Sequence, residues 1–353
     1  MMSEEKRSLF IIPAYHPADT LTELVRQIRQ DGYPVLVVDD GSGDAYLPVF
    51  EQIADAVTLL RHTQNQGKGA AMKTAFSYVL HRMPDVDAVV TVDADGQHLL
   101  PDAERVLARA LAEPGTLVLG CRDFDRDIPW RSRLGNKFTR TAFELASGVR
   151  LTDTQTGLRA FTRDLLPLMT EISGSRYEYE TNQLLACSGS GVPLAEETIE
   201  TVYADRENST SHFHPVRDSL KIFGCILRFA LPELLCEVGE FLLFVMFLRL
   251  FSPLRIPAVA SEALACLLAS VVKFAVRPRP LAGRKIPFSR ALAGFVRRAA
   301  IILAISVVLL FVMTHLFSIG PVVAKLLAEL MILLGGFVLR SVQISRLGKQ
   351  KKA

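Results

Sequence analysis

The sequence predicts an α/β domain over residues 1–222, followed by a helical membrane domain over residues 223–353. Strand-like and helix-like segments alternate along the first 120 residues, and long apolar stretches recur after residue 222. The charge also changes sign. Residues 1–222 carry 23 Lys and Arg against 32 Asp and Glu, whereas residues 223–353 carry 17 against 5. The acidic first part argues against a nucleic-acid partner.

The α/β part is predicted from short apolar runs separated by amphipathic ones. A first helix covers LTELVRQI, with Thr20 and Glu23 as a capping box and Gly32 at its end. Further helices fit at residues 46–55, 68–82 and 101–112. This alternation predicts a mainly parallel sheet with helices on both faces and ligands at the carboxyl ends of the strands. The expected strands are LFIIPAY, VLVVDDGS, VTLLRH, AVVTVDADG and TLVLGCR.

Acidic side chains follow two of these strands. VLVV is followed by Asp39 and Asp40, and AVVTV by Asp93 and Asp95. Alternate residues of a strand point the same way, so Asp93 and Asp95 are expected to present their carboxylates together. Carboxylates are hard ligands that suit Mg²⁺ or Mn²⁺.

The loop N-x-G-K-G at residues 65–69 opens a helix. It either approaches an anion through its backbone amides or only caps the helix. Neither G-x-x-x-x-G-K-[ST] nor a G-x-G-x-x-G after a strand occurs, so the usual signatures of nucleotide hydrolysis and dinucleotide binding are missing.

The membrane part is predicted to cross the bilayer four times, at about residues 228–250, 257–276, 298–317 and 321–340. Basic residues without acids fill the loop after the second span and the C-terminal tail, so the positive-inside rule places both, and the N-terminal domain, on the cytoplasmic side of the membrane. Charges within the spans suggest a polar interior or a path for lipid headgroups, or alternatively the first span starts later and its glutamates lie at the membrane interface. They are Glu233, Glu237, Glu240, Glu262, Lys273, Lys325 and Glu329.

Several motifs occur in a characteristic order: IIPAY, VVDDGS, N-x-G-K-G, DADGQH, GCR and DTQTGLRAF. Through them, residues 8–222 resemble family-2 glycosyltransferases of the GT-A fold. The resemblance is strongest to dolichyl-phosphate mannose synthases and bacterial polyprenyl-phosphate glycosyltransferases. The stretches RFALPELLCEVGEFLLF and VAKLLAELMILLGGFVLR resemble GtrA-like membrane domains.

The resemblance implies a UDP- or GDP-sugar donor, with UDP favoured, a polyprenyl-phosphate acceptor, and Mg²⁺ or Mn²⁺. The implied metal ligands are Asp93, Asp95 and Gln97. The implied catalytic residues are Asp93, Asp95, Arg122 and Arg206. The implied nucleotide-sugar-binding residues are Pro13, Ala14, Tyr15, Asp39, Asp40, Lys68, Asp93, Ala94 and Asp95. The implied acceptor-phosphate-binding residues are Arg131, Arg133, Asn136, Lys137, Arg206 and His212.

Two positions depart from the family pattern. The usual A-Y-N-E reads A-Y-H-P, with His16 and Pro17 at its end, and His212 stands where the phosphate-binding loop often has lysine. Both departures weaken a transfer of donor identity from dolichyl-phosphate mannose synthases.

An acceptor phosphate is already an anion, so it attacks the anomeric carbon without a strong base, and a single displacement inverts that centre. A hydroxyl acceptor would need a carboxylate base. The candidates are Asp153, Glu178 and Glu180, each of which has the alternative of pairing with a neighbouring Arg.

Two other functions stay open. A processive polysaccharide synthase usually carries Q-x-x-R-W, but Pro129 precedes Trp130, the only Trp. Alternatively, the spans translocate a lipid-linked sugar and the α/β part only binds nucleotide, although the intact D-A-D-G-Q favours catalysis. A role in cell-envelope glycan or lipid modification follows from the resemblance, and the oligomeric state, including a homo-oligomer, stays open.

Overall fold

The chain divides into two compact units, and the division falls after Phe229. This point lies inside one long helix, α8 (Pro215–Leu250). The computed structural model describes residues 7–122, 130–200, 215–250, 252, 258–276, 288–332 and 334–335.

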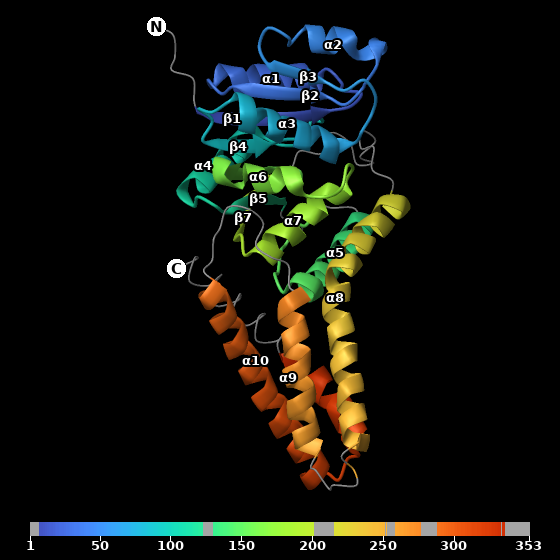
Figure 1. Cartoon of the computed structure of the whole chain (residues 1–353). Coiled ribbons are helices and arrows are strands. Elements are labelled where there is room, and N and C mark those ends of the chain that lie inside the picture. Colours follow the sequence, from blue (N-terminus) through green and yellow to red (C-terminus); the bar gives the residue numbers. More distant parts are fainter. Residues whose placement is uncertain are drawn as a thin grey trace. The chain divides into compact units, whose positions relative to one another are not determined.

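A seven-stranded sheet forms the centre of the first unit, in the order β3-β2-β1-β4-β6-β5-β7 (Figure 1). β6 runs antiparallel to both of its neighbours, and the other pairs are parallel. The predicted α/β class with a mainly parallel sheet is therefore confirmed. The strands are β1 (Ser8–Ala14), β2 (Val35–Asp39), β3 (Thr58–Arg61), β4 (Ala88–Thr91), β5 (Leu117–Arg122), β6 (Arg159–Thr162) and β7 (Leu194–Ile199).

Helices cover both faces of this sheet because β1 is apolar on both sides. Leu9 and Ile11 join the apolar cluster under one set of helices, and Phe10 and Ile12 join the cluster under the other. The first set is α3 (Lys68–Arg82), α5 (Trp130–Ser147), α6 (Leu166–Glu171) and α7 (Glu178–Ser190). The second set is α1 (Thr20–Gln30), α2 (Leu47–Glu51) and α4 (Leu100–Ala112).

Two local predictions differ from the structure. The helix expected over residues 46–55 is a 3₁₀ turn (Asp44–Tyr46) followed by the short α2. The capping box is also wrong, because Thr20 belongs to the first turn of α1 and its hydroxyl donates to the Ala94 carbonyl at 3.2 Å, while Glu23 bonds Arg26 and Gln27. Thr20 thus ties the start of α1 to the turn after β4.

The start of α8 belongs to the core of the α/β unit. Ile222 and Ile226 are buried in the same apolar cluster as Tyr179 and Leu184 of α7. The α/β core therefore extends beyond residue 222.

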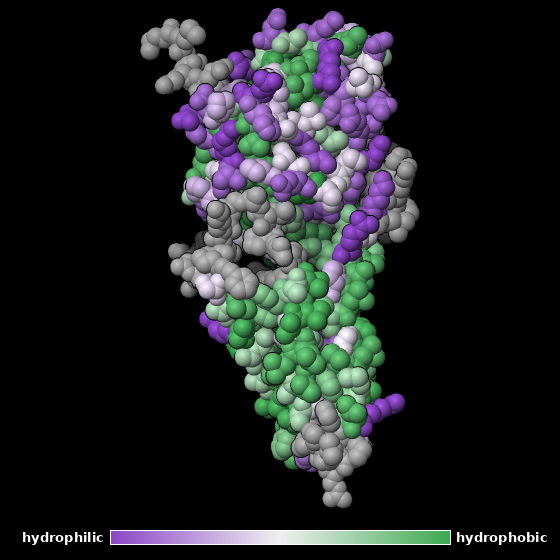
Figure 2. Space-filling view, in the orientation of Figure 1, coloured by the Kyte–Doolittle hydropathy of each residue, from purple (hydrophilic) through white to green (hydrophobic). Residues whose placement is uncertain are grey.

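The second unit contains the later part of α8, α9 (Ala258–Val276), α10 (Phe288–Phe311) and a helix over residues 321–332. Two of its helical stretches, Ala258–Val276 and Leu292–Leu316, are long and apolar enough to cross a membrane. Their surfaces are apolar: Leu267 is 61% exposed and Val271 68% exposed, and hydrophobic residues dominate this unit in Figure 2. Within the described residues, the first and fourth predicted spans are not among the helices that are long and apolar enough to cross a membrane. Residues 336–340 of the fourth predicted span lie outside the described residues.

Candidate active site

The two aspartates of D-A-D lie in a turn after β4. The strand ends at Thr91, and the Val92 N–H continues the pairing to the Ile11 carbonyl at 3.0 Å. The turn closes when the Gln97 N–H donates to the Asp95 carboxylate at 3.0 Å. Burial and then the charge of Asp93 raise the pKa of Asp95. Asp93 and Asp95 lie beyond the strand rather than in it, and the charge of Asp93 acts on Asp95.

Lys68, the first residue of α3, reaches this turn. Its Nζ lies 2.6 Å from Asp93 Oδ1 and 2.6 Å from Glu180 Oε1. Burial opposes the charges on Lys68 and Asp93, but their attraction wins. The pKa of Lys68 is consequently raised and the pKa of Asp93 lies well below its usual range, so both groups stay ionised.

The segment before β6 closes over Asp93. A Cβ atom added to Gly157 would lie 2.4 Å from Asp93 Oδ2 and 2.7 Å from Oδ1. The Thr91 hydroxyl holds this segment by donating to the Gly157 carbonyl at 2.8 Å. Glycine at 157 is therefore required for the observed position of the Asp93 carboxylate. His98 completes this environment, since its Nε2 lies 3.6 Å from Asp93 Oδ2.

The loop N-x-G-K-G caps and docks its helix. The Gln66 and Gly67 N–H groups donate to the Asp40 carboxylate at 2.9 and 2.7 Å, and the Ala70 N–H donates to the Ser175 carbonyl at 2.9 Å. These three amides are thus satisfied within the protein and are not available to an anion.

The two glycines of this loop allow the close approach of the α7 segment. A Cβ at Gly67 would lie 2.4 Å from the Ser175 oxygen, and a Cβ at Gly69 would lie 2.4 Å from Tyr179 Cβ. Tyr179 is the neighbour of Glu180 in α7. The approach consequently brings Glu180 to Lys68.

Asp39 and Asp40 have different surroundings at the end of β2. Asp40 is buried. Its carboxylate accepts the two loop amides and also lies 2.7 Å from His62 Nδ1. Asp39 accepts the Ser42 N–H at 2.9 Å. The geometry gives Asp40 a role in organising the loop before α3, whereas the resemblance implied that it binds the nucleotide sugar.

The residues at the end of β1 form an aromatic stack. The His16 ring lies between Tyr15, at a centroid distance of 3.8 Å, and Tyr46, at 4.5 Å. His16 also has a positive φ of 51°, and its N–H donates to the Ser42 hydroxyl at 3.0 Å. The histidine that departs from the family pattern therefore has a structural role beside Pro13, Ala14 and Tyr15.

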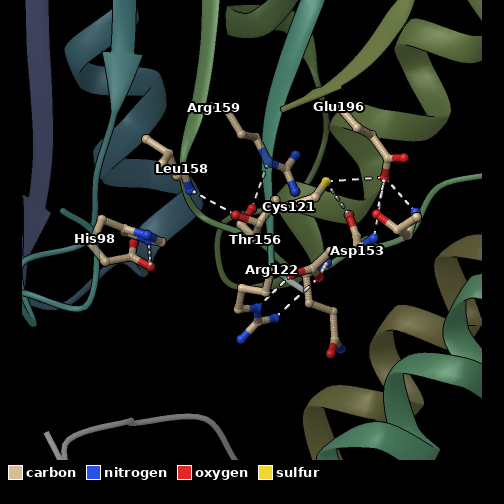
Figure 3. A network of polar contacts seen from close by, with 11 residues as sticks. His98, Cys121, Arg122, Asp153, Thr156, Leu158, Arg159 and Glu196 are labelled. Carbon is tan, nitrogen blue, oxygen red and sulfur yellow. Dashed lines mark hydrogen bonds and ion pairs between the residues drawn. The ribbon is translucent and has the colours of Figure 1, made fainter. Parts of the chain in front are cut away.

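Arg122, at the end of β5, makes a bidentate pair with the fully buried Asp153 (Figure 3). Arg122 Nε lies 2.7 Å from Asp153 Oδ2, and Nη2 lies 3.2 Å from Oδ1. Glu196 of β7 supports the neighbouring loop by accepting the Thr152 hydroxyl at 2.9 Å and the Cys121 thiol at 3.2 Å.

All three candidate bases have partners. Asp153 pairs with Arg122 and Glu180 with Lys68. Glu178 accepts the Ser175 and Arg176 N–H groups, and although burial works against it, these bonds lower the pKa of Glu178. Of the three, Asp153 pairs with an arginine as the alternative expected, whereas Glu180 pairs with a lysine and Glu178 accepts backbone N–H groups.

The side chains of the acceptor-phosphate candidates lie outside the part of the chain that the structure describes. Arg131, Arg133, Asn136 and Lys137 lie in α5, of which only the backbone is described there, and Arg206 and His212 lie outside the described residues. The sequence did not single out Gly157 or His98, and it did not identify Lys68 as the partner of Glu180. The signals that could have identified them are the histidine in DADGQH and the glycine in DTQTG.

Asp93, Asp95 and Gln97 fit a divalent cation by their chemistry. Asp93 already accepts one positive group, the Lys68 ammonium, and Asp95 and Gln97 bring further oxygen donors to the same turn. Two carboxylates with substrate phosphates are a common set for Mg²⁺. Among the described residues, no group of three His, Cys, Asp or Glu forms a complete protein-only metal site.

Comparisons with known proteins identify the family of the α/β unit. Residues 9–167 match the family model "Glycosyl transferase family 2". An uncharacterized protein of Methanocaldococcus jannaschii is 30% identical, over 55% of this chain and 81% of that protein. The UDP-N-acetylglucosamine–dolichyl-phosphate N-acetylglucosaminyltransferase of Methanococcus voltae is 27% identical, over 65% and 99%. The polyprenol monophosphomannose synthase of Mycolicibacterium smegmatis is 28% identical, over 58% and 80%.

A solved structure of a mycobacterial protein has a similar fold, with a TM-score of 0.50 and 19% identity over 63% of this chain and 74% of that one. The α/β unit has the GT-A fold that the motifs implied. The chain belongs to glycosyl transferase family 2 and is a glycosyltransferase.

Proposed function

We propose that this enzyme moves a monosaccharide from a nucleotide sugar to polyprenyl phosphate at the cytoplasmic face of the membrane, with inversion, for cell-envelope glycan or lipid modification. The observation that carries the proposal is the D-A-D turn at the carboxyl end of β4, where Lys68 and Gly157 fix the Asp93 carboxylate. Two of the relatives, a dolichyl-phosphate N-acetylglucosaminyltransferase and a polyprenol monophosphomannose synthase, support the acceptor class.

The donor is assigned to the carboxyl ends of β1, β2 and β4. Asp93, Asp95 and Gln97 would hold Mg²⁺ or Mn²⁺, which when bound stabilises the charge of the leaving nucleoside diphosphate. Pro13, Ala14, Tyr15 and Asp39 line the nucleotide side of this edge, with UDP favoured over GDP.

The acceptor chemistry fits the paired carboxylates. A phosphate monoester attacks as an anion, so Asp153, Glu178 and Glu180 need not be free to act as bases. Arg122 carries charge toward the phosphates while Asp153 fixes its guanidinium plane. The remaining acceptor residues are proposed as Arg131, Arg133, Asn136, Lys137, Arg206 and His212.

The membrane unit is proposed to hold the enzyme where its lipid acceptor resides. Four spans, with the catalytic unit and the C-terminus in the cytoplasm, agree with the basic loop and tail. The apolar exposed surfaces of α9 and α10 support insertion.

The test uses the full chain in membranes with undecaprenyl phosphate and a panel of radiolabelled UDP- and GDP-sugars. We expect label in the organic-extractable lipid with one donor, and loss of that label in Asp95→Ala. Labelling of water-soluble polymer alone would indicate a polysaccharide synthase. Absence of transfer with every donor, together with movement of lipid-linked sugar across the bilayer, would favour a translocation protein.

A further inference from the structure

A cluster of ionised groups joins the helices of the second unit in its interior. We call Glu240, Glu262, Lys273, Lys325 and Glu329 the buried cluster. Lys325 Nζ lies 2.6 Å from Glu262 Oε1, 3.0 Å from Glu329 Oε1 and 3.1 Å from Glu240 Oε1. Lys273 Nζ lies 2.7 Å from Glu240 Oε2. The contacts connect α8, α9 and the helix over residues 321–332.

The centre of the cluster is shielded from solvent. The side chain of Glu262 is 0% exposed, that of Lys325 1% and that of Glu240 7%. Ser306 of α10 also enters, donating to Glu262 Oε1 at 2.7 Å. Charges in such a place cost several kcal/mol unless they are compensated, so groups that persist there have a role in packing or in transport.

The cluster is not neutral when all its members are ionised. It contains three carboxylates and two ammonium groups, which leaves one negative charge among these described residues. Glu237 also contacts Lys273, but its side chain is 45% exposed and lies at the margin.

One carboxylate oxygen at the centre is unsatisfied. Both printed contacts of Glu262 go to Oε1, and Oε2 is buried without a hydrogen-bond partner among the described residues. The excess charge and the unsatisfied oxygen are separate observations, and each leaves room for one further positive group in the cluster.

We propose that the buried cluster binds one exchangeable proton, shared by the carboxyl groups of Glu262 and Glu329, because both oxygens of Glu240 already face ammonium groups. A proton from water joins a carboxylate to give a neutral carboxyl group, and the cluster changes from one net negative charge to none. A proton needs no coordination shell, whereas a metal ion prefers six or so oxygen ligands and would meet two ammonium groups here.

Proton binding is thereby linked to the packing of the second unit. Lys325 is held by carboxylates of α8, α9 and its own helix. A rearrangement that separates the helix over residues 321–332 from α9 would expose these carboxylates to water, where they ionise and release the proton. The membrane unit would then be a proton-linked element, independent of the sugar-transfer site.

The test is infrared difference spectroscopy of the full chain in lipid nanodiscs, in H₂O and D₂O, between pH 6 and 8. Exposed glutamates have a pKa of about 4.3 and are ionised in this range. We expect the carbonyl band of one protonated carboxyl group, shifted in D₂O. Glu262→Gln and Glu329→Gln each neutralise the cluster and should remove this band, whereas Glu237→Gln, at the margin, should keep it.

The comparison between variants also separates this band from any contribution of Asp95, which all of them retain. If Glu262→Gln does not fold, Glu329→Gln provides the same test of the proton-binding proposal, because the Glu329 side chain is only half-buried. Absence of the band in the unaltered protein, or its persistence in the folded variants, would overturn the proposal. So would a band that appears only when Na⁺ and K⁺ are removed, because a metal cation would then be the occupant.

Discussion

Adding a single methyl group beside Asp93 tests whether the position of this carboxylate controls catalysis. In Gly157→Ala, the new Cβ would lie 2.4 Å from Asp93 Oδ2, and ordinary contact begins at 3.4 Å. The carboxylate must therefore move by about 1 Å, a displacement that costs on the order of 100-fold in rate when it misplaces a catalytic group. We expect kcat/KM for transfer to lipid to fall about 100-fold, which is about 2.7 kcal/mol of transition-state stabilisation.

The backbone is not expected to contribute to this loss, because Gly157 is not among the glycines with positive φ. The matched control is Gly224→Ala in α8, where nothing lies within 4 Å of the added Cβ. Its transfer rate should equal that of the unaltered protein, with a stability gain of up to about 1 kcal/mol.

The assay measures label in organic-extractable lipid against the concentrations of donor and Mn²⁺. A normal kcat/KM in a well-folded Gly157→Ala protein would refute the reasoning, since the shifted Asp93 would then be unimportant. A loss that is accompanied by a large fall in melting temperature would instead mean that the segment before β6 had been displaced as a whole.

Four further outcomes are expected. Asp40→Ala leaves two backbone amides and a histidine without their buried acceptor and should lower the free energy of unfolding by about 3 kcal/mol, measured by thermal unfolding. Glu180→Gln removes the charge of one of the two carboxylates that contact Lys68, so Lys68 competes more strongly for Asp93. The apparent Mn²⁺ affinity, measured from the metal dependence of transfer, should weaken about tenfold. EDTA should abolish transfer, and Mg²⁺ or Mn²⁺ should restore it. Burial raises the pKa of Cys187 to about 12, so mass spectrometry should find this thiol unalkylated by iodoacetamide at pH 8 in the folded protein.

The first 122 residues could be read from the sequence because their strands and helices have clear local patterns. The α/β class and the D-A-D position followed from apolar runs that end in acidic residues. Later elements did not, since β6 enters the sheet antiparallel between β4 and β5, and no local period encodes that pairing.

Neighbouring acids illustrate the limit for the site. Asp39 and Asp40 are both buried and occupy successive positions, so the pattern alone could not tell which one holds the loop before α3. That role depends on His62 and on the loop amides, which reach Asp40 only in the folded chain. Long-range packing also determines the ion-pair partner of Glu180, because Lys68 lies at the start of a different helix.

The glycines around Lys68 connect this packing to the chemistry. Because Gly67 and Gly69 admit the α7 segment, Lys68 lies between Asp93 and Glu180 instead of in solvent. With Asp95, these groups sum to three carboxylates and one ammonium, a formal charge of −2 that one divalent cation would neutralise. A bulky residue at Gly69 would therefore be expected to reduce metal affinity without touching a metal ligand, since it would withdraw Glu180 and leave Lys68 to compete for Asp93.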